Sequence, residues 1–296
     1  MNIEISTLSQ KQINKVGKRF RDAIHDENDF EVLEEFKKSY DDLLINYTSK
    51  ISKDLDKLNT NYVMAGRLKR TSSIIRKLQR LNNKGMDLTR MSDLAGTRII
   101  VKNLEDQKKI LNFLKENYNV EKVYDYTNAD QNYKSLHLII KEDQFKYFEV
   151  QIRTLAQQTW ADESEEFGEQ AKQGLYSEEV RDYLTLLSSV MYKIDNKIDI
   201  DLDKIDNHLF DIKSPVKGKF KIIQNEFNMK FNLYEKPHYF LIVYDSLDST
   251  LVSKDIFDSD EKEKIFELYR YKSKVLDESQ FEIIFFVSSL GDDVLR

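Results

Sequence analysis

The stretch "FEVQIRT" at residues 148–154 decides the fold, because its side chains alternate between two chemical kinds. The first, third and fifth residues are apolar, and the residues that follow each of them are Glu149, Gln151 and Arg153. Successive side chains of a β-strand point to opposite faces of its sheet. The stretch is therefore predicted to be a strand with one face in the core. Its other face would present a carboxylate, an amide and a guanidinium in a row.

The preceding segment, "NYKSLHLII" at residues 132–140, alternates in the same way before it becomes an apolar run. Tyr133, Ser135 and His137 occupy every second position, and "KEDQ" at 141–144 is predicted to be a turn. If the two strands form a hairpin in matching register, six polar groups share one surface. The alternative is an ordinary two-faced sheet with a wet side, but Tyr-Ser-His beside Glu-Gln-Arg favours a site.

The rest of the chain divides into helical and extended segments by its apolar spacing. Helices are predicted within 8–60 and at 70–82, 104–118, 154–171 and 177–210, with strands at 97–103, 134–141 and 146–153. Residues 211–220 hold one of the two prolines and one of the eight glycines, and are predicted to be a linker. Beyond them, "HYFLIVYDS" and "FEIIFFVSS" flank a helix. This predicts a domain at 1–210 and a small α/β module, or an added sheet layer, at 211–296.

The composition favours a protein of a reducing compartment. The 296 residues are 40% hydrophobic and 33% charged, which suffices for a core and for solubility. They contain no cysteine, which excludes disulfides and thiolate metal sites. No run of about 18 apolar residues is present. We therefore expect a cytoplasmic protein without a membrane partner, and the sequence leaves open whether it forms a homo-oligomer.

Positive charge is concentrated in residues 61–90, although the net charge is −6. This window holds eight basic side chains against one acidic one, Asp87, as expected of a site for a polyanion. A solvated basic helix face is the alternative. Arg67, Lys69, Ser73 and Lys77 could surround a triphosphate. The sequence contains neither a Walker A motif nor a G-x-G-x-x-G loop, so a nucleotide would bind by other means.

A second candidate element is "RMSDLAGTRIIV" at residues 90–101. Asp93 shortly precedes the predicted strand, Gly96 allows a close backbone approach, and Arg98 lies at the strand's start. Asp93 and Glu149 could together hold one Mg²⁺, which takes one or two protein carboxylates and completes its shell with water and substrate phosphates. The alternative is that Asp93 caps the local turn.

Four motifs in a fixed order give the chain a family resemblance. "GRLKRTSSIIRKLQR", "DLAGTRIIV", "NYKSLHLII" and "EVQIRTLAQQTWAD" resemble the synthetase domain of the RelA/SpoT family, the alarmone synthetases, over about residues 40–175. The resemblance implies an α+β fold, with a mixed β-sheet flanked by helices and related to nucleotidyltransferases. It also implies an ATP-dependent pyrophosphokinase that moves the β,γ-pyrophosphate of ATP to the ribose 3′-hydroxyl of GDP or GTP. The products would be (p)ppGpp-type alarmones of the stringent response.

The resemblance also implies a role for each candidate residue. On the donor side, the residues that would hold ATP are Arg67, Lys69, Ser73, Lys77 and Arg98. Asp93 and Glu149 would hold Mg²⁺, and Glu149 would take the proton of the attacking hydroxyl. On the acceptor side, the base would stack on Tyr133, and the positioning residues would be His137, Gln151 and Arg153.

Two departures from the family concern the acceptor. The segment "YTNADQNYKSLH" lacks the family's proline and glycine, and "DESEEFGEQ" at 162–170 has five acidic side chains where the family tends to have basic ones. Both changes remove positive charge near the expected acceptor phosphates. The second hypothesis is therefore a toxin-type enzyme that modifies the 3′ CCA end of tRNA, with residues 211–296 as a neutraliser or sensor. A catalytically inactive nucleotide-binding protein is the third, although Asp93 and Glu149 are both present.

Overall fold

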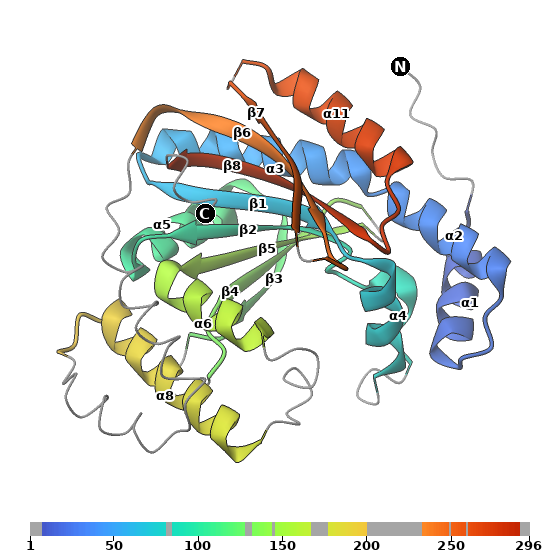
Figure 1. Cartoon of the computed structure of the whole chain (residues 1–296), viewed down its shortest axis with the longest axis horizontal. Coiled ribbons are helices and arrows are strands. Elements are labelled where there is room, and N and C mark those ends of the chain that lie inside the picture. The colour runs from blue at the N-terminus through green and yellow to red at the C-terminus, as the bar shows by residue number, and fades with distance from the viewer. Residues whose placement is uncertain are drawn as a thin grey trace.

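The computed structural model describes residues 8–80, 85–127, 132–143, 146–166, 177–199, 233–248, 250–258 and 260–290. Its centre is an eight-stranded mixed sheet in the order β3-β4-β5-β2-β1-β8-β6-β7 (Figure 1). The strands are β1 (Tyr62–Leu68), β2 (Ala95–Val101), β3 (Val120–Asp125), β4 (Leu136–Lys141), β5 (Tyr147–Thr154), β6 (Leu233–Asp245), β7 (Thr250–Phe257) and β8 (Phe281–Leu290). The mixed sheet with flanking helices confirms the predicted α+β class.

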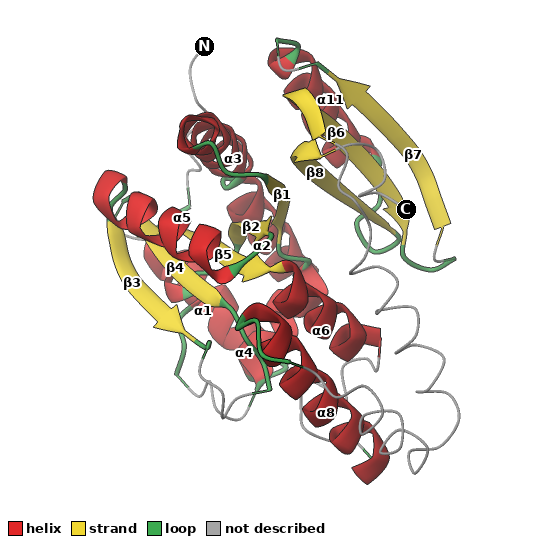
Figure 2. Ribbon diagram, turned by 90° about the vertical axis from the view of Figure 1, so that its left-hand side faces the viewer, coloured by secondary structure: helices red, strands yellow, loops and turns green. Residues whose placement is uncertain are grey.

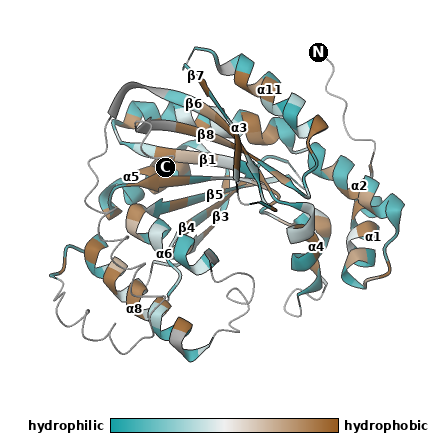
Figure 3. Cartoon of the chain, in the orientation of Figure 1, coloured by the Kyte–Doolittle hydropathy of each residue, from teal (hydrophilic) through white to brown (hydrophobic). Residues whose placement is uncertain are grey.

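The described helices surround this sheet. They are α1 (Gln10–Arg21), α2 (Glu27–Lys38), α3 (Asp41–Leu55), α4 (Thr71–Gln79), α5 (Leu104–Asn117), α6 (Leu155–Glu166), α8 (Glu178–Asp195) and α11 (Lys262–Val275), with short 3₁₀ turns η1 (Asp56–Leu58) and η3 (Leu88–Arg90). Most show hydrophobic and hydrophilic patches on different sides (Figure 3). Within the described part of the chain, every helix is too short or too polar to cross a membrane.

The predicted hairpin is confirmed. Strands β4 and β5 pair antiparallel with His137 opposite Gln151, so their alternating polar residues share a face. Strand β2 pairs with β5 in parallel, and Gly96 lies opposite Glu149. The remaining neighbours pair antiparallel, including β1 with both β2 and β8.

Three strands were not predicted from the sequence. Strand β1 begins with the apolar run Tyr62–Ala65, which places apolar residues on both faces, so its sequence lacks the two-residue alternation that signals a strand. Strand β3 is largely exposed and carries charged residues, and β7 is an edge strand with exposed residues on both faces. In all three, pairing with a neighbour stabilises the extended conformation more than the local sequence does.

The segment beyond residue 232 extends the same sheet. Strand β8 inserts between β1 and β6, and β7 forms the edge. These strands therefore continue the sheet of the preceding residues sideways. The predicted boundary at 210/211 lies outside the described residues, and the neutraliser or sensor role of 211–296 stays a prediction.

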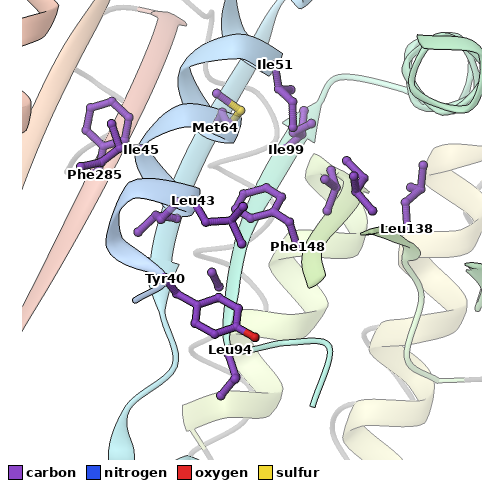
Figure 4. Close-up of a cluster of buried hydrophobic side chains, with 14 of the residues drawn as sticks. Tyr40, Leu43, Ile45, Ile51, Met64, Leu94, Ile99, Leu138, Phe148 and Phe285 are labelled. Carbon is purple, nitrogen blue, oxygen red and sulfur yellow. The ribbon is translucent and has the colours of Figure 1, made fainter. Parts of the chain in front are cut away.

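One face of the sheet is covered by helices that share a continuous core. Strand residues such as Ile99, Val150 and Phe285 are buried there with residues of α3, α5 and α11. Figure 1 shows α3 behind the sheet and α6 in front of it. Figure 4 shows Phe285 in the same cluster as Met64 and Ile99, which belong to β1 and β2. A smaller cluster joins α6 to α8, where the Trp160 indole donates to the Leu184 carbonyl at 2.8 Å.

We predict that Phe285→Ala destabilises the whole chain. Phe285 is 3% exposed, and its ring centroid lies 5.7 Å from that of Tyr239 and 5.4 Å from that of Phe266. Losing this ring from a packed core should lower the free energy of unfolding by about 3–5 kcal/mol. Urea denaturation would measure the change, with Leu247→Ala, at a residue 72% exposed, as the control. Equal stability of the two variants would mean that β8 is not part of the main core.

Candidate active site

A pocket of about 330 Å³ lies on the face of the sheet opposite the main core. It spans four adjacent strands, β5, β2, β1 and β8, which Figure 2 shows from the side. Its polar and charged lining residues are Arg67, Lys69, Asp93, Thr97, Arg98, Glu149, Gln151 and Gln158. Side chains from three of the four motifs therefore line one cavity.

Gly96 allows the two carboxylate-bearing strands to approach closely. A Cβ atom at Gly96 would lie 2.7 Å from the Glu149 carbonyl oxygen and 3.3 Å from the Glu149 Cβ. Backbone cannot move aside as a flexible side chain can, so a larger residue would push β2 from β5. This contact brings Asp93, three residues before Gly96, and Glu149 to the same pocket.

Asp93 is a largely buried carboxylate held by two lysines. Its Oδ2 atom accepts from Lys69 Nζ at 3.1 Å and from Lys77 Nζ at 2.7 Å. Burial by itself would raise the pKa of Asp93, but the two ammonium groups outweigh burial and hold that pKa below its usual value. Its Oδ1 atom is buried and has no hydrogen-bond partner. This oxygen is therefore available to a ligand.

Glu149 is oriented by hydrogen bonds to both of its oxygens. Its Oε1 atom lies 2.9 Å from His137 Nδ1, and its Oε2 atom accepts from Gln151 Nε2 at 2.9 Å. Arg153 donates to the Tyr133 hydroxyl at 2.8 Å, and that hydroxyl lies 2.7 Å from His137 Nε2. The hydroxyl can therefore donate its one proton to Nε2, which leaves Nδ1–H to donate to Glu149. This series of hydrogen bonds ends on the Glu149 carboxylate and fixes its orientation.

Arg98 is a desolvated cation in the same pocket. Burial, followed by the nearby charge of Arg153, lowers its pKa to about 10, partly offset by Glu165 of α6. At neutral pH the guanidinium stays charged, so the pocket holds a poorly solvated positive group. A bound anion would offset the free-energy cost of keeping this guanidinium charged away from water.

Some of the predicted site residues line the pocket, and the others lie around it. Lys77 is not among the lining residues and acts on the pocket through Asp93, whereas the Ser73 hydroxyl accepts from Arg76 at 3.2 Å outside the lining. Tyr133, His137 and Arg153 lie beside the pocket, behind Glu149 and Gln151. The roles of all these residues stay predictions.

The prediction that Ser135 shares the polar surface is wrong. Ser135 is fully buried, and its hydroxyl lies 3.5 Å from the carbonyl oxygen of Ile152. Strand β4 begins only at Leu136, so strand alternation does not extend back to Ser135. Tyr133 also precedes the strand, but its long side chain brings its hydroxyl to 2.7 Å from His137 Nε2.

Several residues of the site were missed by sequence reasoning. Tyr124 and Tyr126 stack with an interplanar angle of 8°, and the Tyr126 ring centroid lies 5.7 Å from that of Tyr133. The tyrosines at 124 and 126 are two apart, which is the spacing of one strand face and could have revealed them. Ile284 and Phe286 of β8 also line the pocket, and no local signal links them to residues more than 120 positions earlier.

The residues present fit one Mg²⁺ ion. Asp93 offers an unused oxygen, and Glu149 lines the same pocket. In the part of the chain that the structure describes, no three His, Cys, Asp or Glu side chains gather into a metal site. Two carboxylates match Mg²⁺, which keeps waters and substrate phosphates as its other ligands.

A comparison with family models shows which known proteins the pocket-forming part of the chain is similar to. Residues 66–173, which carry nearly all of the pocket's residues outside β8, match the model described as "Region found in RelA / SpoT proteins". These residues are similar to the region shared by RelA and SpoT proteins. The resemblance seen in the four motifs is thereby confirmed for this part of the chain.

Relatives of the RelA/SpoT region share part of their length with this chain. GTP pyrophosphokinase YwaC of Bacillus subtilis (strain 168) is 38% identical over 112 residues, 32% of this chain and 52% of that protein. GTP pyrophosphokinase YjbM of the same organism is 29% identical over 109 residues, 33% of this chain and 52% of that protein. The chain thus spans about half the length of the curated relatives it matches.

Solved structures similar to this chain include the small alarmone synthetase 1 from Bacillus subtilis. It is 23% identical, with a TM-score of 0.48, and the match covers 61% of this chain and 99% of that one. The small alarmone synthetase 2 from the same organism is 26% identical, with a TM-score of 0.47 and the same coverage.

We predict that Asp93→Asn lowers stability at neutral pH. The folded pKa of Asp93 is depressed, so its contribution is present above the unfolded pKa of about 3.9 and is lost as pH falls through the folded pKa. The variant should lose about 1–3 kcal/mol of unfolding free energy at pH 7, and the difference should shrink toward pH 3. Urea titrations at both pH values would measure it, with the more exposed Asp87→Asn as the control. A pH-independent difference would contradict the ion pairs.

Proposed function

We propose that this chain is an ATP-dependent pyrophosphokinase that transfers the β,γ-pyrophosphate of ATP to the 3′-hydroxyl of GDP or GTP. The observation that carries the proposal is the pocket itself, where Asp93 and an oriented Glu149 lie among the cations Arg67, Lys69 and Arg98. Pyrophosphoryl transfer requires cationic groups around the phosphates and one carboxylate base. The RelA/SpoT region and the names of its relatives support the same reaction.

The donor and the acceptor would bind at different sides of the pocket, with the reacting groups between them. ATP phosphates would lie against Lys69, Arg67 and Arg98, and the acceptor ribose would lie beside Glu149, on the side of the Tyr133–His137 pair. The 3′-oxygen attacks the β-phosphorus, the bond from that phosphorus to the α,β-bridging oxygen breaks, and AMP leaves. Glu149 accepts the hydroxyl proton, and His137 and Gln151 hold its carboxylate in place. Mg²⁺ held by Asp93 and Glu149 would neutralise phosphate charge.

We also propose a cytoplasmic location. ATP and guanine nucleotides are available there, and a chain of 296 residues without cysteine suits a reducing compartment.

A second candidate acceptor is the 3′ CCA end of tRNA. One observation favours it over a free nucleotide. The stacked rings of Tyr124 and Tyr126, continued by Tyr133, could hold successive bases of a single strand.

A labelling experiment tests the proposal and separates the acceptors. Purified full-length chain with [γ-³²P]ATP and Mg²⁺ is expected to label GDP or GTP, while label in bulk tRNA alone would replace the nucleotide acceptor. Glu149→Gln should lower the transfer rate by at least about 100-fold, because the base is lost. Glu121→Gln, an exposed carboxylate on β3, is the matched control. Absence of product with every acceptor would instead support an inactive nucleotide-binding protein.

The acceptor side has its own prediction. Tyr133→Ala should raise the acceptor KM about tenfold through loss of the stacking ring, while ATP affinity changes less than about twofold. Tyr133→Phe keeps the ring but removes the hydroxyl that joins Arg153 to His137, so it should affect kcat more than KM. Steady-state kinetics with each substrate varied would separate these effects. Unchanged acceptor kinetics in Tyr133→Ala would remove this residue from the site.

A further inference from the structure

Strand β8 lies beside the RelA/SpoT region and shares the face of the sheet that carries the pocket. Phe286 is opposite Ala65 of β1, which is opposite Arg98 of β2, which is opposite Gln151 of β5. These four residues form one row across the sheet. Phe286 is therefore in line with the candidate active site, although it is more than 130 residues further along the chain.

Two side chains of β8, Ile284 and Phe286, point into the pocket rather than into the main core. The residues between and beside them, Ile283, Phe285 and Val287, pack in the core under α11. By strand alternation, Ile284 and Phe286 must face the other way. Both are only partly buried and both line the pocket. The main core thus leaves them exposed to the cavity.

The lining of the pocket changes character along the strands. At one end it is charged, with Lys69, Asp93 and Glu149. Toward the other end it is apolar, with Val63, Ala65, Ile100 and Phe286, while Ile284 lies on the Arg67 side of Phe286 along β8. Because Val63, Ala65 and Arg67 follow one another along β1, this gradient follows the length of that strand. A ligand with a charged tail and a flat apolar head fits such a pocket in one direction.

We propose that β8 forms the base-binding wall of the donor subsite, with Phe286 and Ile284 contacting the purine ring of ATP. This inference rests on the proposed function, since it takes ATP as the donor. The triphosphate lies toward Lys69 and Asp93, and the purine lies over the row that contains Phe286 and Arg98. An aromatic face and a guanidinium are both groups on which a nucleobase stacks.

An ion pair fixes β8 beside this subsite. Glu282 accepts from Arg67 at 2.5 Å and also pairs with Arg70, and its side chain is 14% exposed. Glu282 lies on the same face as Ile284 and Phe286, because all three positions are two apart. The pair holds the register of β8 against β1 and so keeps Phe286 opposite Ala65.

The test compares two ligands that share the phosphates but not the base. Calorimetric titration of the full chain with Mg²⁺-ATP and with Mg²⁺-tripolyphosphate would be carried out on the wild type and on Phe286→Ala. The variant is expected to bind ATP about tenfold more weakly, since one stacking face is lost, while tripolyphosphate affinity changes less than about twofold. Phe286→Tyr keeps the ring and should bind ATP within about twofold of the wild type.

Matched variants distinguish a local effect from a loss of structure. Ile256→Ala removes an apolar side chain from β7 on the same face, opposite Phe240 and outside the pocket, and should leave both affinities unchanged. Ile284→Ala is the second pocket variant and should also weaken ATP alone. Equal weakening of both ligands by the pocket variants, or no weakening of ATP, overturns the inference.

The outcomes also separate this inference from the proposed function. A wild type that binds ATP through Phe286 but transfers no pyrophosphate would contradict the function and keep the base wall. If the wild type transfers pyrophosphate and Phe286→Ala binds ATP as tightly as the wild type, the function is supported and the base wall is contradicted. A wild type that fails to bind ATP would overturn both.

Discussion

The close approach of Gly96 to the backbone of Glu149 is the constraint on which the site depends. Any side chain at Gly96 would meet the Glu149 carbonyl oxygen at 2.7 Å, and that contact could be relieved only by separating β2 from β5. These two strands form the parallel pair of the sheet's centre. One strand carries Arg98 and follows Asp93, and the other carries Glu149 and Gln151. The pairing therefore sets the distance between the groups that would act together.

Around this pair the pocket is electrostatically divided. The Asp93 carboxylate pairs with two lysines and Glu282 pairs with Arg67, yet Arg98 remains as a further cation in the lining. On the other side of Glu149, uncharged groups relay hydrogen bonds from Arg153 to the carboxylate. Such a division suits a reaction in which a polyanion is held on one side and a hydroxyl is deprotonated on the other.

Much of the candidate site could be predicted because its signals are local. Glu149, Gln151 and Arg153 share a face through strand alternation alone, and the hairpin partner His137 followed from the same rule. The rule failed for Ser135, which precedes the strand, and for β1, whose apolar residues on both faces conceal its period. The basic window was also predicted, but its sequence did not reveal that Lys69 and Lys77 turn toward Asp93 while Arg67 and Arg70 turn toward Glu282.

The amino-acid sequence by itself determined the periods of its strands and helices, the four ordered motifs and the concentration of positive charge. These properties lie within stretches of a few residues, where side-chain spacing decides which face is buried. Only the tertiary structure decided that β8 pairs with β1 and brings Ile284 and Phe286 to the pocket. The reason is physical: strands more than 200 residues apart select each other by hydrogen bonding and by the burial of Phe285 and Val287 in a shared core. No local pattern specifies such a partner.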